Sequence, residues 1–222
     1  MRRLAAAARG TQEERRSEAE RRLVEAAAEL IGELGVARVT LAGVGERAGY
    51  SRGLATHYFG SKGALIQRVV DLATAEFRAA LGRRRRPAAA LDELRALVQT
   101  FFEIVSALPP VHRACLVLGA DAVSAGAAEV RPAMVSFDRR FREEVAKGIE
   151  RGIAAGAFPR STDPTGLAAV VVGMLRGVAF QSMIDGELDL DACRVEVERL
   201  LAARLGPAAA PRPKRPRKGR PR

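Results

Sequence analysis

Apolar residues recur every three or four positions along most of the chain, a spacing that gathers side chains on one face of an α-helix. In the first third of the chain, small polar residues that favour helix N-caps precede this pattern at Ser17, Thr40, Ser51 and Ser61. Glycines that favour helix ends follow at Gly35, Gly49 and Gly60. The pattern predicts a first helix of about 17 residues, then two short helices joined by a turn, then a fourth helix whose apolar stripe reaches Phe77.

The helical period continues to residue 206, and proline and glycine separate the predicted helices. These helices cover residues 91–105, 111–123, 130–155, 164–183 and 190–205. Asp163 is predicted to cap the helix that begins at Pro164, because proline is favoured in a first helical turn. We therefore predict an all-α fold, with a helix-turn-helix domain followed by a larger helical domain.

Charge is distributed unevenly along the chain. Lys and Arg number 37 against 26 Asp and Glu, a net charge of +11. The excess lies in residues 1–10, 82–86 and 207–222, whereas residues 17–81 are neutral and residues 87–206 are slightly acidic. The predicted parts are a flexible basic arm (1–16), an N-terminal domain (17–81), a C-terminal domain (87–206) and a disordered basic tail (207–222). The break between the two domains falls at the run Arg83–Arg86.

Other features exclude several classes of protein. The two cysteines, Cys115 and Cys193, are too few for a metal-ligand cluster, so neither a metal nor a cofactor is expected. No uninterrupted apolar stretch approaches the ~20 residues of a membrane span, and the N-terminus is too weakly apolar for a secretory signal. These observations predict a soluble, cytoplasmic protein with reduced thiols and no membrane partner.

Two short helices joined by a glycine-containing turn are typical of a helix-turn-helix, which here spans residues 40–59. The second helix of such a motif lies in the major groove of DNA, with its N-terminal side chains against base edges. The corresponding segment, from Ser51 to Phe59, offers hydroxyl groups, one guanidinium and one imidazole. Lys62 falls in the first turn of the next helix, where free backbone N–H groups favour a phosphate.

The segment Thr40-Leu-Ala-Gly-Val-Gly-Glu-Arg-Ala-Gly-Tyr-Ser-Arg-Gly-Leu-Ala-Thr-His-Tyr-Phe-Gly-Ser-Lys-Gly-Ala-Leu65 resembles the TetR/AcrR family of transcriptional regulators. The resemblance extends upstream through the first predicted helix. It implies a three-helix DNA-binding head on a helical, dimerising and ligand-binding body. It also implies a repressor that binds a palindromic operator in double-stranded DNA as a homodimer and is released by a small-molecule effector.

The resemblance also assigns contacts by position. Backbone contacts fall on Thr40, Tyr58 and Lys62, and base or groove contacts on Ser51, Arg52, Thr56 and His57. The family's usual tyrosine three residues before Phe59 is Thr56 here, so we expect Tyr58 to take over a phosphate contact. Arg52 has a second interpretation, as the partner of a glutamate such as Glu46. Gly43 and Gly45 are poor helix formers within the second helix.

The segment from Leu118 to Leu201 resembles the C-terminal domain of BetI-like members of this family. That resemblance implies a dimer interface built from the last two helices, for which we expect Val170, Met174, Val178 and Leu200. The alternative is that these four residues are core within one chain. Candidate liners of an effector pocket are Phe101, Phe102, His112, Cys115, Phe137, Phe141 and Met174, each of which is also compatible with ordinary core. Choline is not predicted as the effector, since this domain lacks Trp and Tyr for an ammonium cage.

Two other functions compete with a specific regulator. The basic tail could drive non-specific DNA binding. The segment Gly49-Tyr-Ser-Arg-Gly53 matches the G-x-S-x-G pattern of a serine hydrolase, although that elbow requires a preceding strand and a distant histidine. We therefore expect a regulator with no catalytic residues.

Overall fold

A computed structural model of the chain describes residues 2–84, 89–124 and 127–206, and these are helical with no strand among them. The helices are α1 (Arg2–Leu34), α2 (Leu41–Arg47), α3 (Leu54–Phe59), α4 (Lys62–Gly82), α5 (Ala90–Ala107), α6 (Pro110–Asp121), α7 (Arg131–Ala154), α8 (Pro164–Ile184) and α9 (Leu190–Leu205), with a 3-10 turn at Val36–Arg38. The all-α prediction is confirmed. The predicted tail, 207–222, and part of the Arg83–Arg86 break lie outside the described residues.

Most of the predicted helix caps are confirmed. The Thr40 side chain accepts a hydrogen bond from the backbone N–H of Gly43, and those of Ser61 and Asp163 cap α4 and α8 in the same way. Each bond satisfies a backbone N–H that has no partner within its own helix. Gly60 ends α3 with a φ of 68°, a conformation that side chains other than glycine rarely adopt.

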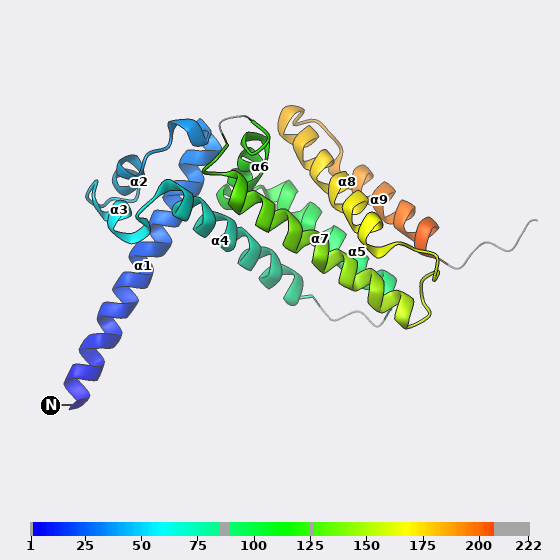
Figure 1. The fold of residues 1–222 in the computed structure, drawn as a ribbon, viewed down its shortest axis with the longest axis horizontal. Helices are drawn as coiled ribbons and strands as arrows, with labels where there is room; N and C mark the ends of the chain where they lie inside the picture. Colours follow the sequence, from blue (N-terminus) through cyan, green and yellow to red (C-terminus); the bar gives the residue numbers. More distant parts are fainter. Residues whose placement is uncertain (1, 85–88, 125–126, 207–222) are drawn as a thin grey trace, which may run out of the picture.

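Two predicted helix starts were wrong. The first helix begins at Arg2 rather than at a Ser17 cap, so residues 2–16 continue α1 as a projecting rod instead of a separate arm (Figure 1). The segment is rich in Ala, Arg and Glu, which are strong helix formers. Their combined helix propensity outweighs the low propensity of Gly10. The recognition helix begins at Leu54 rather than after a Ser51 cap, because residues 51–53 form a turn in which Leu54 N–H bonds the Ser51 carbonyl.

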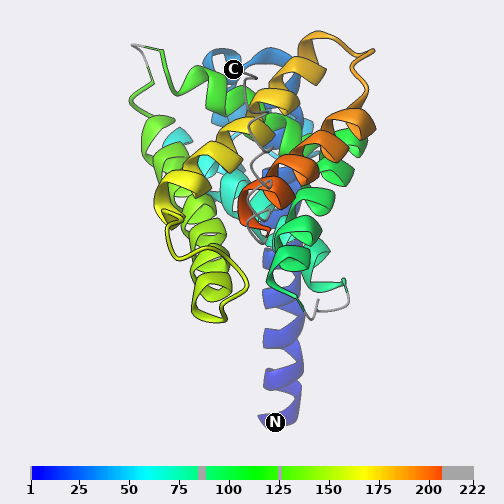
Figure 2. The ribbon, with the colours of Figure 1, turned by 90° about the vertical axis from the view of Figure 1, so that its right-hand side faces the viewer.

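The buried side chains form two clusters that do not coincide with the two predicted domains. The first cluster joins α1–α4 to α6 and to the beginning of α7, and the second joins α5, α8 and α9 to the rest of α7. Helix α6 packs along α1, where Asp121 accepts a bond from Val36 N–H at 3.3 Å and Arg113 donates to the Gly32 carbonyl at 3.3 Å. The helix-turn-helix head therefore shares its core with the body (Figures 1 and 2).

Helix α8 changes the expectation about membranes. By length and composition it could cross a membrane, and the bent pair α5–α6 passes the same test as one unit. In the structure α8 packs against α7, α9 and α5, with Ala168, Val171, Leu175 and Ala179 buried. It also carries Arg176, which is paired with Asp138 of α7, so it is an integral helix of the body.

Candidate nucleic-acid interface and internal cavity

A close approach of backbone to backbone sets the geometry of α2 and α3. A Cβ atom on Gly45 would lie 2.5 Å from the Ser51 carbonyl oxygen, well inside van der Waals contact. Tyr50 N–H bonds the Gly45 carbonyl at 2.9 Å and closes the turn. Ala55 of α3 is fully buried, while Phe59 packs against the first core at the end of the helix. Gly45 is thus required by packing, in spite of its poor helix propensity.

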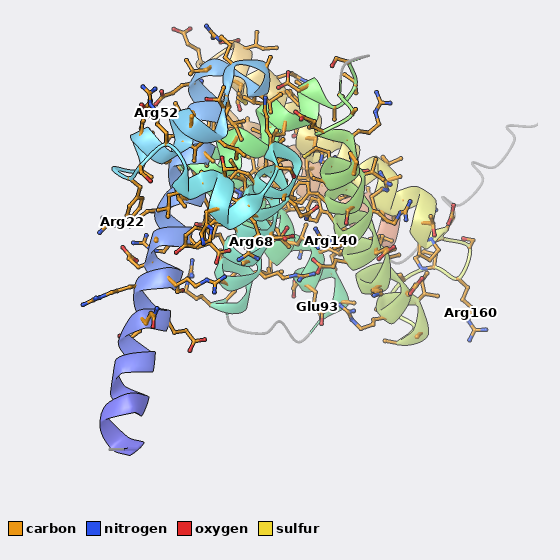
Figure 3. The ribbon with its side chains drawn as sticks, turned by 60° about the vertical axis from the view of Figure 1, so that its left-hand side comes forward. Arg22, Arg52, Arg68, Glu93, Arg140 and Arg160 are labelled. Atoms are coloured by element: carbon orange, nitrogen blue, oxygen red, sulfur yellow. The ribbon has the colours of Figure 1, made fainter. Side chains whose placement is uncertain are left out.

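The predicted base-contacting residues lie together on the outside of this motif. Ser51, Arg52, Thr56 and His57 are all exposed, and Figure 3 shows Arg52 at the outer edge of the head, away from the body helices. The Arg52 side chain is 78% exposed and forms an ion pair with Glu46 of α2. An exposed pair contributes about 0–1 kcal/mol, so DNA can displace Glu46 at little cost.

The predicted backbone-contacting residues flank that surface. Thr40 is exposed at the N-terminus of α2, and Lys62 is the first residue of α4. Both lie where backbone N–H groups and the positive end of the helix dipole face outward, an arrangement that attracts phosphate. Tyr58 is half-buried, and its hydroxyl donates to the Arg16 carbonyl at 3.3 Å.

The structure adds α1 residues that the sequence analysis did not select. Arg15, Arg16 and Gln12 line a polar groove together with His57 and Tyr58 of the recognition helix. The Arg16 guanidinium lies 6.0 Å from the centre of the Tyr58 ring, a cation–π distance. Arg15 and Arg16 are balanced in sequence by Glu13 and Glu14, so neither local charge nor periodicity placed them beside α3.

The geometry at Ser51 differs from a hydrolase elbow. The serine follows α2 rather than a strand, and the described residues contain no strand that could precede it. His112, the histidine distant in sequence, lies on α6 in the interior of the body. The G-x-S-x-G match is therefore part of the helix-turn-helix.

A cavity of about 150 Å³ lies between α4, α5, α6, α7 and α8. Five of the seven predicted liners are on its wall: Phe101, His112, Cys115, Phe137 and Phe141. The other two are not on this wall, because helix rotation turns them elsewhere. Phe102 is 4% exposed and lies in the second core, and Met174 packs against that same core.

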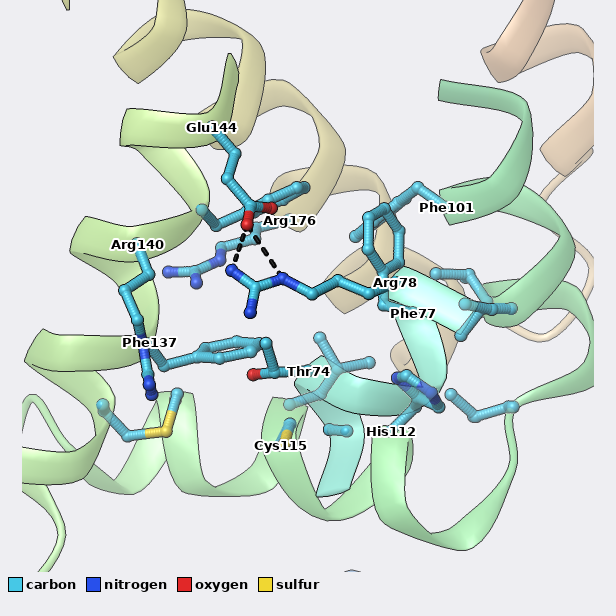
Figure 4. Close-up of a pocket in the computed structure, with 18 of the residues that line it drawn as sticks. Thr74, Phe77, Arg78, Phe101, His112, Cys115, Phe137, Arg140, Glu144 and Arg176 are labelled. Atoms are coloured by element: carbon cyan, nitrogen blue, oxygen red, sulfur yellow. Dashed lines mark hydrogen bonds and ion pairs between the residues drawn. The ribbon is translucent and has the colours of Figure 1, made fainter. Parts of the chain in front are cut away.

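Charged residues on the cavity wall were not anticipated. Arg78 of α4 reaches across to Glu144 of α7 and donates to its carboxylate from Nε at 2.9 Å (Figure 4). Arg140 of α7 and Arg176 of α8 line the cavity beside Phe137 (Figure 4). Charged residues on amphipathic helices normally face solvent. The one available signal in the sequence was a single arginine within the apolar helix α8.

Burial determines the ionisation of the cavity's other polar groups. It lowers the pKa of His112 to about 4, so the imidazole is neutral at pH 7, with Nε2 3.3 Å from a Glu76 carboxylate oxygen. It raises the pKa of the Cys115 thiol to about 12, which keeps the thiol protonated and unreactive. Among the described residues, no group of three or more His, Cys, Asp or Glu is arranged to hold a metal ion.

The predicted dimer residues divide into two groups. Val170 of α8 is 57% exposed and Leu200 of α9 is 55% exposed, so both can meet a partner. Met174 and Val178 are half-buried and pack against the second core of their own chain. These two residues are therefore compatible with the core alternative and with an interface.

Comparisons with known proteins agree with this architecture. Residues 23–69 match the family of bacterial regulatory proteins of the tetR type, and residues 90–192 match a tetracyclin repressor-like C-terminal domain. The HTH-type transcriptional regulator BetI of Burkholderia mallei is 31% identical over 192 residues, covering 82% of this chain and 93% of that protein. BetI of Paraburkholderia phytofirmans is 28% identical over 185 residues, with the same coverage.

Solved structures share the fold at lower identity. A TetR-family regulator from Rhodococcus sp. superimposes with a TM-score of 0.76 at 21% identity, over 86% of this chain and all of that one. A regulator from Saccharomonospora viridis in complex with choline gives a TM-score of 0.68 at 23% identity, over 85% of this chain and 98% of that one. With its helix-turn-helix head and helical body, the chain belongs to the TetR family of bacterial transcriptional regulators.

Proposed function

We propose that this protein is a cytoplasmic repressor that binds a palindromic operator as a dimer and is released by a small molecule in its internal cavity. The observation that carries the proposal is the exposed set Ser51, Arg52, Thr56 and His57 on the α2–α3 motif. These side chains supply donors and acceptors for base edges in a major groove. Lys62 and Thr40 flank them at positions suited to phosphate.

The apolar outer faces of α8 and α9 support dimerisation. Val170, Leu200 and Ile184 are large apolar residues that are more than half exposed. On α8, Gly173 and Gly177 lie on the same side as Val170, and a Cβ atom added to either would meet nothing within 4 Å. A second copy packed on this face would bury the exposed apolar area and could approach closely at the glycines. Two-fold symmetry then predicts a palindromic operator.

The position of the cavity supports release by a ligand. Helix α4 begins at Lys62 beside the recognition helix, and its second half supplies Phe77 and Arg78 to the cavity wall. Cys115 and Met134 belong to both the cavity wall and the core of the head. A ligand that moves α4 or α6 therefore changes the position of the head and the spacing of the two recognition helices in a dimer.

Selection of bound sequences from random double-stranded DNA tests the proposal. The wild-type chain should enrich one palindromic consensus, and a variant with both Arg52→Ala and His57→Ala should enrich an altered one. Identical consensus sequences for the two proteins would remove Arg52 and His57 from base recognition. Enrichment of no consensus, with binding abolished by deletion of residues 207–222, would instead establish non-specific binding through the tail.

A further inference from the structure

Two nitrogen atoms on the cavity wall have no hydrogen-bond acceptor among the described residues, although both are buried. They are Nε of Arg140 and Nη2 of Arg176. A buried donor without a partner is destabilising, more so when it is charged, so native structures rarely leave one. Both arginines line the same cavity and lie on one wall of it, beside Phe137 (Figure 4).

The charges around this wall leave one positive charge uncompensated. Asp138 is shared by two arginines, Arg142 and Arg176. The other guanidinium groups each have their own carboxylate: Arg78 pairs with Glu144, and Arg140 lies 3.3 Å from Asp71. Burial of Arg176 disfavours its charged form and lowers its pKa, so an additional anion beside it would be stabilising.

The opposite end of the cavity offers no comparable charge. His112 is neutral there (Figure 4), and Glu76, its neighbour at 3.3 Å, does not line the cavity and is 45% exposed. Among the residues that the structure describes, Glu144 is the only acidic one on the wall, and its carboxylate is already bonded by Arg78. The remaining surface is mainly apolar, and the Phe141 ring is stacked on that of Phe101 and edge-on to that of Phe77. The cavity volume is about 150 Å³. An engineered apolar cavity of ~150 Å³ binds benzene, so this cavity can hold a ligand of that size.

We propose that this cavity binds a small carboxylate with a compact apolar body, whose anionic group accepts hydrogen bonds from Arg176 Nη2 and Arg140 Nε. A carboxylate accepts several hydrogen bonds, and bonds between a guanidinium and a carboxylate are among the strongest in proteins. The quaternary ammonium group of choline accepts none and would be repelled by Arg176. The proposal rests on the proposed function, since it names the class of effector for that cavity.

Direct binding to the full-length protein tests this assignment without any dependence on DNA. Titration calorimetry is performed with benzoate, phenylacetate and hexanoate, with the alcohol and the amine of matching carbon skeleton for each acid, and with choline. At least one acid should bind more tightly than its own alcohol and amine. Binding of choline or of an amine in preference to every acid, or binding of no acid, would overturn the proposal.

Three variants locate the anionic group. Arg176→Met and Arg140→Met should each weaken binding of the acid about tenfold to a hundredfold, with the alcohol unaffected. Arg176→Lys keeps a positive charge beside Asp138 but loses the planar guanidinium fork, and it should also weaken binding of the acid. This variant replaces Arg176→Met if the latter does not fold. Arg139→Met is the matched control, because Arg139 is next to Arg140 in sequence on α7 but is exposed and does not line the cavity, and its effect should stay within about twofold. Unchanged affinity of the acid in both the Arg176→Lys and Arg140→Met variants would contradict the assignment.

The same ligand then separates this inference from the proposed function. An acid that binds the cavity and releases the selected DNA supports both. An acid that binds with the expected variant pattern but leaves DNA binding unchanged supports the ligand class and contradicts the ligand-released repressor.

Discussion

The hydroxyl of Tyr58 on the recognition helix donates a hydrogen bond to the backbone carbonyl of Arg16 on α1, at 3.3 Å. The guanidinium of the same arginine lies 6.0 Å from the centre of the tyrosine ring. These two contacts join segments 42 residues apart in sequence and hold the basic rod of α1 beside α3. Tyr58, expected from the sequence to touch phosphate, thereby positions Arg16, which with the neighbouring Arg15 lines the groove beside α3.

The joint substitution Arg15→Ala and Arg16→Ala is predicted to weaken DNA binding regardless of sequence. Each arginine that neutralises a phosphate contributes about 0.9 to the slope of log affinity against log salt concentration. Loss of both should therefore reduce the slope by up to about 2. Fluorescence anisotropy across a salt series measures this. The matched control is Arg21→Ala with Arg22→Ala, which lie on the same helix but pair with Glu18. Equal losses in the two double variants would argue against a specific role for Arg15 and Arg16.

Lys62→Ala is predicted to weaken binding to the selected operator and to unrelated DNA by a similar factor, because a phosphate contact carries no sequence information. The salt slope should fall by about 1. Arg160→Ala is the control, since Arg160 is exposed at the opposite end of the molecule (Figure 3). A loss confined to the operator would show that Lys62 reads bases instead.

Gly45→Ala is predicted to destabilise the protein by about 1–3 kcal/mol, because the new methyl group collides with the Ser51 carbonyl. Helix propensity alone predicts the opposite sign, a gain of about 0.5–1 kcal/mol. Gly53→Ala is the control, since its Cβ would meet nothing within 4 Å and its φ is −82°. Urea unfolding of both variants distinguishes the two expectations, and a stabilised Gly45→Ala protein would show that the turn relaxes freely.

Acidification is predicted to destabilise the body through His112. Burial places its folded-state pKa near 4, below the ordinary 6.5, so the unfolded chain takes up the proton first. The stability that His112 contributes is present above pH 6.5 and is lost as the pH falls toward 4. Between pH 7 and 5 the loss is about 2 kcal/mol, opposed in part by Glu76, whose pKa burial raises.

The pH series is measured by urea unfolding of wild type and of His112→Gln, which cannot take up the proton. The variant should lose less stability between pH 7 and 5. His57→Gln, which alters the exposed histidine, should follow wild type. If the His112→Gln profile matches that of wild type, the imidazole is not the group responsible.

The sequence by itself determined the family, the all-helical fold and the positions of most helix boundaries. Helical periodicity, the Thr40, Ser61 and Asp163 caps and the glycine stops are local properties, set by backbone bonds within a few residues. The helix-turn-helix itself followed from the same local order, whereas its contact residues were assigned by the resemblance to the TetR/AcrR family.

Tertiary structure decided the features that depend on contacts between several helices, namely the lining of the cavity and the close approach at Gly45. Helix rotation moved Phe102 and Met174 off the cavity wall, and the packing of α7 against α4 and α8 brought Arg140 and Arg176 onto it. The close approach that makes Gly45 necessary involves the backbone of a following turn. A charged residue or a glycine stands in the same local sequence pattern whether it faces solvent or another helix. Only the packed structure therefore distinguishes an exposed position from a contact between helices.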